Sequence, residues 1–150
     1  MRPLIFLLCT WFGLGKLPRV PGTWGSLGAL PFAWGLQYLG GPWGLAVGTA
    51  FVALLSLWAI RLYLIYWPGD DPGEVVIDEV AGQWMTLVFV PLDFTLYAFA
   101  FFAFRFFDMV KVWPASWADR NLTGAPGVLI DDLFAGVYGM LTMLVLLYYW

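Results

Sequence analysis

The sequence has no histidine, a single cysteine and few charged residues, and each scarcity excludes a class of protein or site. Without histidine, schemes that need an imidazole base, nucleophile or metal ligand are excluded. The lone Cys9 excludes a disulfide framework and a thiolate metal cluster, and we expect it to be a small buried apolar residue. Charged residues make up 11% of the chain and hydrophobic residues 62%, with a mean hydropathy of +0.81. Because about a quarter of the residues in soluble domains are charged, this composition predicts a membrane protein.

The length of 150 residues leaves room for roughly four to six membrane spans of about 20 residues and little else. The apolar runs lack the alternating segments of about 10 residues that are typical of outer-membrane barrels. Residues 3–15 are apolar but too short to span, so a shallow or re-entrant segment is expected there. The sequence therefore predicts one all-α domain over 1–150, a polytopic membrane helical bundle of about four to five spans.

Apolar runs and helix breakers predict helices at about 24–40, 43–67, 73–92, 94–113 and 128–150. Tight turns at 40–42 and 91–93 join the first four into two hairpins. Counting the membrane crossings along the chain then places one charged residue, Asp93, on one side of the membrane. The other side receives Lys16, Arg19, Arg61, Asp70, Asp71, Glu74, Asp78, Glu79, Arg105, Asp108, Lys111, Asp119, Arg120, Asp131 and Asp132. Since basic residues gather there, the positive-inside tendency makes this side cytoplasmic.

Some of these charges fall within the predicted helices, in the cytoplasmic third of the membrane. They are Asp78, Glu79, Arg105, Asp131 and Asp132. An acid or arginine at the centre of a span costs about 2.5 to 3.5 kcal/mol, and less near the interface, so such residues usually mark a functional site.

Two segments share a pattern, VIDEVAG at 76–82 and VLIDDLFAG at 128–136. In each, an isoleucine precedes two acids, and small residues follow one turn later on the same face. Small residues let membrane helices approach closely, so the two acidic pairs can be drawn together. Four carboxylates in a partly dry site require a cation, and all-oxygen ligands suit Mg²⁺. The alternative is that these acids are solvated residues favoured by the positive end of a helix dipole.

Cations occur in two further segments. Arg105, Asp108 and Lys111 follow one another at spacings of three and could grip a phosphate, or simply form an ion-paired helix end beside lipid headgroups. KLPRVPGTWGS at 16–26 places basic residues before a Pro-Gly turn and a helix start. Free amides there, with nearby hydroxyls, could cradle an oxyanion, although the same pattern is also an ordinary loop and cap.

Together these stretches resemble the phosphatidylglycerophosphatase A family of bacterial membrane phosphatases. The resemblance rests on VPGTWGSLGALP at 20–31, GEVVIDEVAGQWMTL at 73–87, FRFFDMVKVWPASWADRN at 104–121 and GVLIDDLFAG at 127–136. In this order and spacing they cover most of the chain. Two departures occur: Val112 replaces a proline that the family typically has, and 124–127 reads GAPG where a Gly-Gly pair is common.

The resemblance implies Mg²⁺-dependent hydrolysis of phosphatidylglycerophosphate to phosphatidylglycerol in phospholipid synthesis, at the cytoplasmic face of the inner membrane. The expected partner is the phospholipid substrate, with no nucleic acid and no obligate protein partner evident. We expect metal ligation by Asp78, Glu79, Asp131 and Asp132, and charge compensation by Arg105 and Lys111. Asp108 could bind metal, act as general base or orient Arg105. Substrate binding is expected from Lys16, Arg19, Thr23 and Ser26.

Other mechanisms fit the residues less well. A histidine nucleophile, as in type-2 phosphatidate phosphatases, is excluded, and Cys9 lacks the arginine of a Cys-x5-Arg loop. The haloacid-dehalogenase Asp-x-Asp-Thr pattern and the Asp-Gly of CDP-alcohol phosphotransferases are also missing. An ion-conducting protein would spread its acids through the membrane depth. A metal-activated water or an attacking aspartate is the expected nucleophile.

Overall fold

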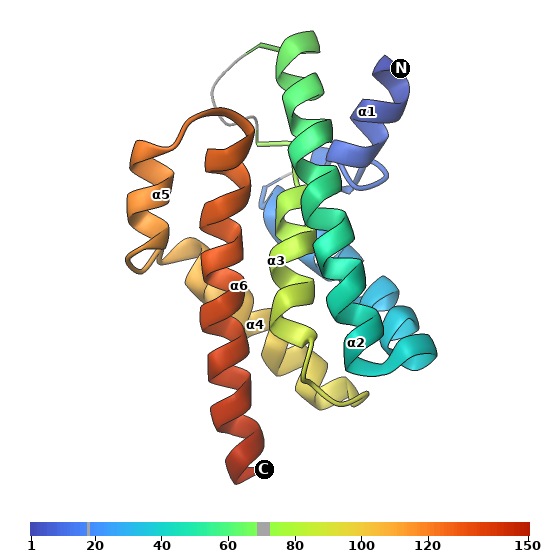
Figure 1. Cartoon of the computed structure of the whole chain (residues 1–150), viewed down its shortest axis with the longest axis vertical. Helices are drawn as coiled ribbons and strands as arrows, with labels where there is room; N and C mark the ends of the chain where they lie inside the picture. The colour runs from blue at the N-terminus through green and yellow to red at the C-terminus, as the bar shows by residue number, and fades with distance from the viewer. Residues whose placement is uncertain (18, 69–72) are drawn as a thin grey trace.

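The computed structural model describes residues 1–17, 19–68 and 73–150, and within these ranges every regular element is a helix (Figure 1). The predicted all-α class is confirmed. Asp70 and Asp71, which the sequence pattern assigns to the cytoplasmic side, lie outside the described residues. The helices are α1 (Arg2–Cys9), the short 3-10 helix η1 (Leu14–Lys16), α2 (Pro21–Tyr66), α3 (Ile77–Leu87), α4 (Phe94–Met109), α5 (Ala115–Asn121) and α6 (Gly124–Tyr149).

Helix α2 consists of two arms that meet at the predicted turn. Gly41 has φ of 65° and ψ of −160°, which is not helical, and Pro42 follows it. A positive φ of this kind favours glycine, which lacks a Cβ. The arms 21–40 and 42–66 then run back along each other as a hairpin, as Figure 1 shows. The predicted first hairpin is therefore present, with its break at the predicted position.

Helix α3 lies between α2 and α6 and is almost entirely buried. It has 11 residues, fewer than the predicted range 73–92, and at 1.5 Å per residue it is about 16 Å long. It begins at Ile77 rather than at residue 73, because the preceding residue bonds to the N-terminal segment instead. The amide of Val76 donates to the carbonyl of Cys9 at 2.7 Å. The N-terminal segment thus packs against the start of α3.

Buried polar groups link α2, α3 and α4 at the end of the molecule opposite the start of α6. Gln37 donates to the carbonyl of Val90 at 2.6 Å and accepts from the hydroxyl of Tyr97 at 2.6 Å. Trp84 donates from its indole to the carbonyl of Ala29 at 2.9 Å. Because an unpaired polar group costs several kcal/mol in hydrocarbon, these bonds fix how α2, α3 and α4 meet.

Two of the described helices, α2 and α6, are long and apolar enough to cross a membrane. Helix α4 has 16 residues and ends at Met109 rather than at the predicted 113. Helix α5, within the predicted link 114–127, was not expected, and it packs against α6. These elements bring the start of α3, the end of α4 and the start of α6 to one end of the molecule.

Candidate active site

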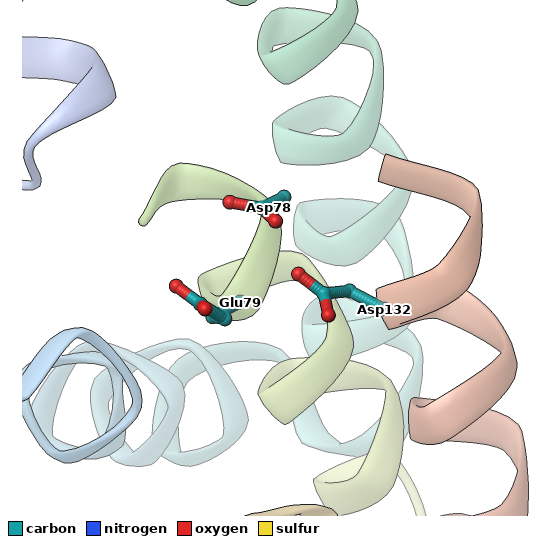
Figure 2. Close-up of side chains that lie close together, drawn as sticks. All are labelled: Asp78, Glu79 and Asp132. Atoms are coloured by element: carbon teal, nitrogen blue, oxygen red, sulfur yellow. The ribbon is translucent and has the colours of Figure 1, made fainter. Parts of the chain in front are cut away.

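Three carboxylates converge between α3 and α6 (Figure 2). Asp78 and Glu79 occupy the first turn of α3, and Asp132 projects from α6. One oxygen of each lies within 4.8 Å of the other two. Asp78 is 5% exposed and Asp132 3%. We call these residues the acidic trio; their mutual repulsion in a partly dry site favours binding of a cation.

The acidic trio forms because glycines let α3 and α6 approach closely. A Cβ on Gly82 would lie 2.7 Å from the backbone oxygen of Asp132, and one on Gly136 would lie 2.6 Å from the backbone oxygen of Gly82. Only residues without a side chain fit at these distances. The predicted contact between the small-residue faces of the two helices is therefore confirmed.

The donor set fits a magnesium ion. Mg²⁺ prefers oxygen ligands at about 2.0 to 2.1 Å, so two oxygens on one ion lie no more than about 4.2 Å apart. The oxygens of the trio, within 4.8 Å of one another, are close to that spacing. Carboxylates alone would leave other positions for water and a phosphate, as magnesium sites commonly do.

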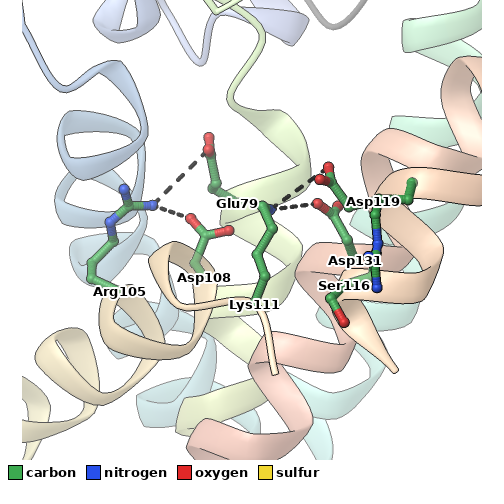
Figure 3. A network of polar contacts seen from close by, with 8 residues as sticks. Glu79, Arg105, Asp108, Lys111, Ser116, Asp119 and Asp131 are labelled. Carbon is green, nitrogen blue, oxygen red and sulfur yellow. Dashed lines mark hydrogen bonds and ion pairs between the residues drawn. The ribbon is translucent and has the colours of Figure 1, made fainter. Parts of the chain in front are cut away.

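Arg105 lies against one side of the acidic trio, near the end of α4 (Figure 3). Its Nη1 pairs with Oδ2 of Asp108 and lies 4.0 Å from Oε1 of Glu79. Gly22, in the first turn of α2, completes this contact: a Cβ there would lie 2.6 Å from Glu79 Oε1 and 2.9 Å from Arg105 Nη1. The carboxyl of Asp108 in turn neighbours that of Asp132.

Lys111 and Asp131 form a second charged group, next to the trio. Lys111 follows α4 with a left-handed φ of 32°, and its Nζ lies 2.7 Å from Oδ2 of Asp131 and 3.9 Å from Oδ1 of Asp119 (Figure 3). Burial alone lowers the pKa of Lys111, but its hydrogen bond to Asp131 and the charges of Asp131, Asp108 and Asp132 outweigh burial and raise this pKa. Lys111 therefore remains a cation at neutral pH.

Both charged groups line one cavity of about 460 Å³. Its walls include Asp78, Glu79, Asp108, Lys111, Asp119, Arg120, Asp131 and Asp132, together with the loop and first turn that begin α6. The lining combines these acids with one lysine and one arginine, Lys111 and Arg120, and such a mixture suits a ligand that carries both a metal ion and a phosphate.

The sequence-predicted residues thus divide into groups. Asp78, Glu79 and Asp132 come together, whereas Asp131 turns to Lys111. Thr23 and Ser26 lie on the first turns of α2 beside Gly22, and the hydroxyl of Ser26 is buried with no hydrogen-bond partner among the described residues. Lys16 and Arg19 are exposed and do not line the cavity, and Lys16 lies over the Phe6 ring at 5.1 Å.

Sequence reasoning missed two residues that contribute to this geometry. The sequence pattern places Gly22 only in a Pro-Gly turn, whereas in the structure its missing side chain leaves room for Glu79 and Arg105. Asp119, on α5, was counted among the cytoplasmic charges but not as a neighbour of Lys111. Gly22 directly precedes the candidate residue Thr23, which places it at the same helix start. No pattern in the sequence indicates that α5 approaches Lys111.

Comparison with known proteins identifies relatives of this chain. A curated phosphatidylglycerophosphatase A from Escherichia coli is 42% identical over 87% of this chain and 76% of its own length. The Haemophilus influenzae protein of the same name is 32% identical over 97% of this chain and 90% of its own. A Bacteroides thetaiotaomicron protein, whose name proposes a phosphatidylinositol-3-phosphatase, is 35% identical over 93% and 91%.

No solved structure matches the chain significantly. The family model for phosphatidylglycerophosphatase A matches residues 7–147, which is nearly the whole chain and includes every residue of the acidic trio. On these matches, the chain belongs to the phosphatidylglycerophosphatase A family.

Proposed function

We propose that this protein is a Mg²⁺-dependent phosphatase that hydrolyses phosphatidylglycerophosphate to phosphatidylglycerol and phosphate in bacterial phospholipid synthesis. Family membership supports the substrate. The observation that carries the mechanism is the convergence of Asp78, Glu79 and Asp132 within 4.8 Å, in a cavity that Lys111 also lines.

Asp78, Glu79 and Asp132 are the proposed metal ligands, with Asp131 as a fourth acid whose main partner is Lys111. When bound, the ion neutralises charge on the phosphoryl oxygens and lowers the pKa of a coordinated water. The protein's part is to hold three carboxylates in one place without histidine or cysteine ligands. The close α3–α6 contact at Gly82 and Gly136 supports that rigidity.

Arg105 and Lys111 are proposed to offset the charge that builds on the phosphoryl group. They lie on different sides of the acids, and each is held by a carboxylate: Arg105 by Asp108 and Lys111 by Asp131. Such fixed cations stabilise a transition state because they need no rearrangement as the charge develops. Of the roles open to Asp108, the ion pair favours orienting Arg105.

The reaction is the displacement of an alcohol by water at phosphorus. The water oxygen bonds to phosphorus, the ester bond to the terminal glycerol oxygen breaks, and a proton from the water ends on that oxygen. The carboxylates of the cavity can accept and return this proton, since several lie within reach of one another.

The N-terminal turns of α2 are proposed to bind the rest of the headgroup. Gly22 contacts both Glu79 and Arg105, so amides of this helix start lie beside the proposed phosphate position. Ser26 offers a buried hydroxyl and Thr23 a half-buried one. Lys16 and Arg19, which are exposed outside the cavity lining, would attract the bridging phosphate or the glycerol.

We propose that the chain lies in the bacterial inner membrane as a bundle of about four to five membrane segments. The two arms of α2, together with α4 and α6, contact lipid, and α3 is enclosed by them. The cavity then opens at the cytoplasmic face, where the substrate headgroup lies. The lipid substrate is the only partner that this proposal requires.

The test is a phosphate-release assay on purified protein in detergent. Phosphatidylglycerophosphate should release phosphate with Mg²⁺, none should be released in EDTA, and added Mg²⁺ should restore the rate. Phosphatidate and phosphatidylinositol 3-phosphate serve as comparison substrates. Equal rates with and without EDTA, or no release from phosphatidylglycerophosphate, would contradict the proposal.

A further inference from the structure

A groove lined by apolar side chains lies between the first arm of α2 and α4, outside the polar cavity. Its volume is about 720 Å³. The lining includes Leu27, Leu30 and Trp34 from α2 and Tyr97, Ala98 and Phe101 from α4. The hydroxyl of Tyr97 is already bound to Gln37, so it offers no free polar group to a ligand.

This groove begins next to the proposed phosphate site. Gly22 and Arg105 are in contact, and they belong to the same two helices that form the groove. Leu27 lies a little more than one turn after Gly22, and Phe101 lies about one turn before Arg105 on the same face. The groove and the contact between Gly22 and Arg105 are therefore formed by the same two helices, about one helical turn apart.

Aromatic rings close the far end of the groove. Trp34 stacks on Phe94 with ring centroids 4.9 Å apart and meets Tyr97 edge-on at 5.1 Å. The residues of α4 that line the groove, from Phe94 to Phe102, cover a rise of about 12 Å. One leaflet of the hydrocarbon core is about 15 Å deep, so the groove has room for most of a single lipid chain in one leaflet.

We propose that this groove holds one acyl chain of the phospholipid substrate while its phosphate group lies at Arg105; the assignment rests on the proposed function. Its lining is apolar and its edge is open, since Leu27 is 44% exposed and Phe102 66%. Hydrocarbon is the ligand chemistry that such a lining favours. Because Phe101 of the groove lies about one helical turn from Arg105 on α4, a lipid with a phosphorylated headgroup can fill the groove and reach Arg105 together.

A substitution that fills the groove tests the proposal, because it should affect lipids with long acyl chains more than lipids with short ones. Ala98 lines the groove and is exposed, and Ala98→Trp would place an indole within it. Ala50→Trp is the matched control, because Ala50 is exposed on α2 and does not line the groove. For long-chain phosphatidylglycerophosphate, Ala98→Trp should raise KM at least about tenfold relative to the control. For a short-chain, water-soluble analogue, the two variants should have the same KM.

The outcomes separate this proposal from the proposed function. If the wild-type protein releases phosphate from neither lipid, the proposed function itself fails. If it is active but both variants behave alike on both lipids, only the groove assignment is overturned. An equal loss on both lipids also overturns it, because an acyl-chain groove must discriminate between chain lengths.

A labelling experiment on the wild-type protein avoids dependence on any variant's folding. Phosphatidylglycerophosphate with a photoreactive group midway along one acyl chain should label peptides that contain residues 27–34 or 97–102. Phosphatidylcholine with the same chain should label them at least about fivefold less, because it lacks the terminal phosphate. Equal labelling by both lipids would show that bulk lipid fills the groove. Labelling of a second copy of the chain by lipid bound to the first would identify a dimer contact. Either result overturns the proposal.

Discussion

Asp131 and Asp132 are adjacent in sequence, yet their carboxyls have different surroundings. Asp132 joins Asp78 and Glu79, whereas Asp131 pairs with Lys111 at 2.7 Å. Successive residues on a helix point about 100° apart, so two neighbouring acids can serve two different groups. At this scale, the site consists of the acidic trio and a separate carboxylate, Asp131, that is paired with Lys111.

Asp132→Asn should lower kcat/KM at saturating Mg²⁺ by more than about 100-fold, because it removes a charged ligand rather than a residue behind one. Asp93→Asn is the matched control. Asp93 caps α4 at the opposite end, where its side chain accepts from the amide of Leu96 at 3.0 Å, and asparagine caps helices equally well. Phosphate release measured over a range of Mg²⁺ concentrations checks both variants. Full activity of Asp132→Asn would remove this residue from the metal site.

At the scale of helices, the site depends on how closely α3 and α6 approach. Gly136 packs on the backbone of Gly82, and Gly139 packs on the side chain of Thr86. The hydroxyl of Thr86 lies 3.2 Å from the carbonyl oxygens of both Gly82 and Gly136. This contact carries Asp132 to the first turn of α3, so helix packing and ligand geometry are coupled.

Gly136→Ala should therefore destabilise the protein and weaken magnesium binding together. Its Cβ would lie 2.6 Å from the backbone oxygen of Gly82 and 3.0 Å from Cβ of Met85, and neither atom can rotate away. The expected loss is about 1 to 3 kcal/mol in the free energy of unfolding, with a higher Mg²⁺ concentration needed for half-maximal activity.

Gly35→Ala is the control for this substitution. Within the described ranges, nothing lies within 4 Å of the position that its Cβ would take, and Gly35 is also helical. The change should stabilise the protein by up to about 1 kcal/mol, since alanine favours helices over glycine. Thermal unfolding in detergent measures both variants. Equal unfolding temperatures for the two would contradict a close α3–α6 contact.

At the scale of the whole molecule, charge is gathered at one end. The cavity collects acids and cations from α3, α4, α5 and α6, whereas Asp93 lies at the start of α4, at the other end (Figure 1). In the proposed topology this charged end faces the cytoplasm, because basic residues gather on that side.

Labelling of single cysteines checks that orientation. Trp43, after the break in α2, is 81% exposed, and Trp113, next to Lys111, is 69% exposed. In intact spheroplasts, a membrane-impermeant maleimide should label Trp43→Cys, and it should label Trp113→Cys only after permeabilisation.

The native cysteine should not interfere with this labelling. Cys9 is fully buried, and burial, with a smaller contribution from the charge of Asp78, raises the pKa of its thiol to about 12. Its reactive thiolate is therefore scarce at neutral pH. The unmodified protein is the control, and the reverse labelling pattern of the two variants would invert the proposed topology.

The sequence by itself determined the all-α class and the family. Apolar composition predicted helices in a membrane, and the Gly-Gly-Pro turn at 40–42 predicted the break that Gly41 makes in α2. The two acidic segments, each followed by small residues, predicted a contact between α3 and α6. These features are local, because hydropathy, turn chemistry and helical period depend on residues close together in the chain.

Only the tertiary structure decided which charged groups meet. It turned Asp131 toward Lys111, brought Gly22 against Glu79 and Arg105, shortened α3 to Ile77–Leu87, and opened the apolar groove beside the site. These outcomes depend on the rotation and tilt of each helix about its neighbours. Because packing between segments distant in the chain sets that rotation, no spacing within one helix could have specified them.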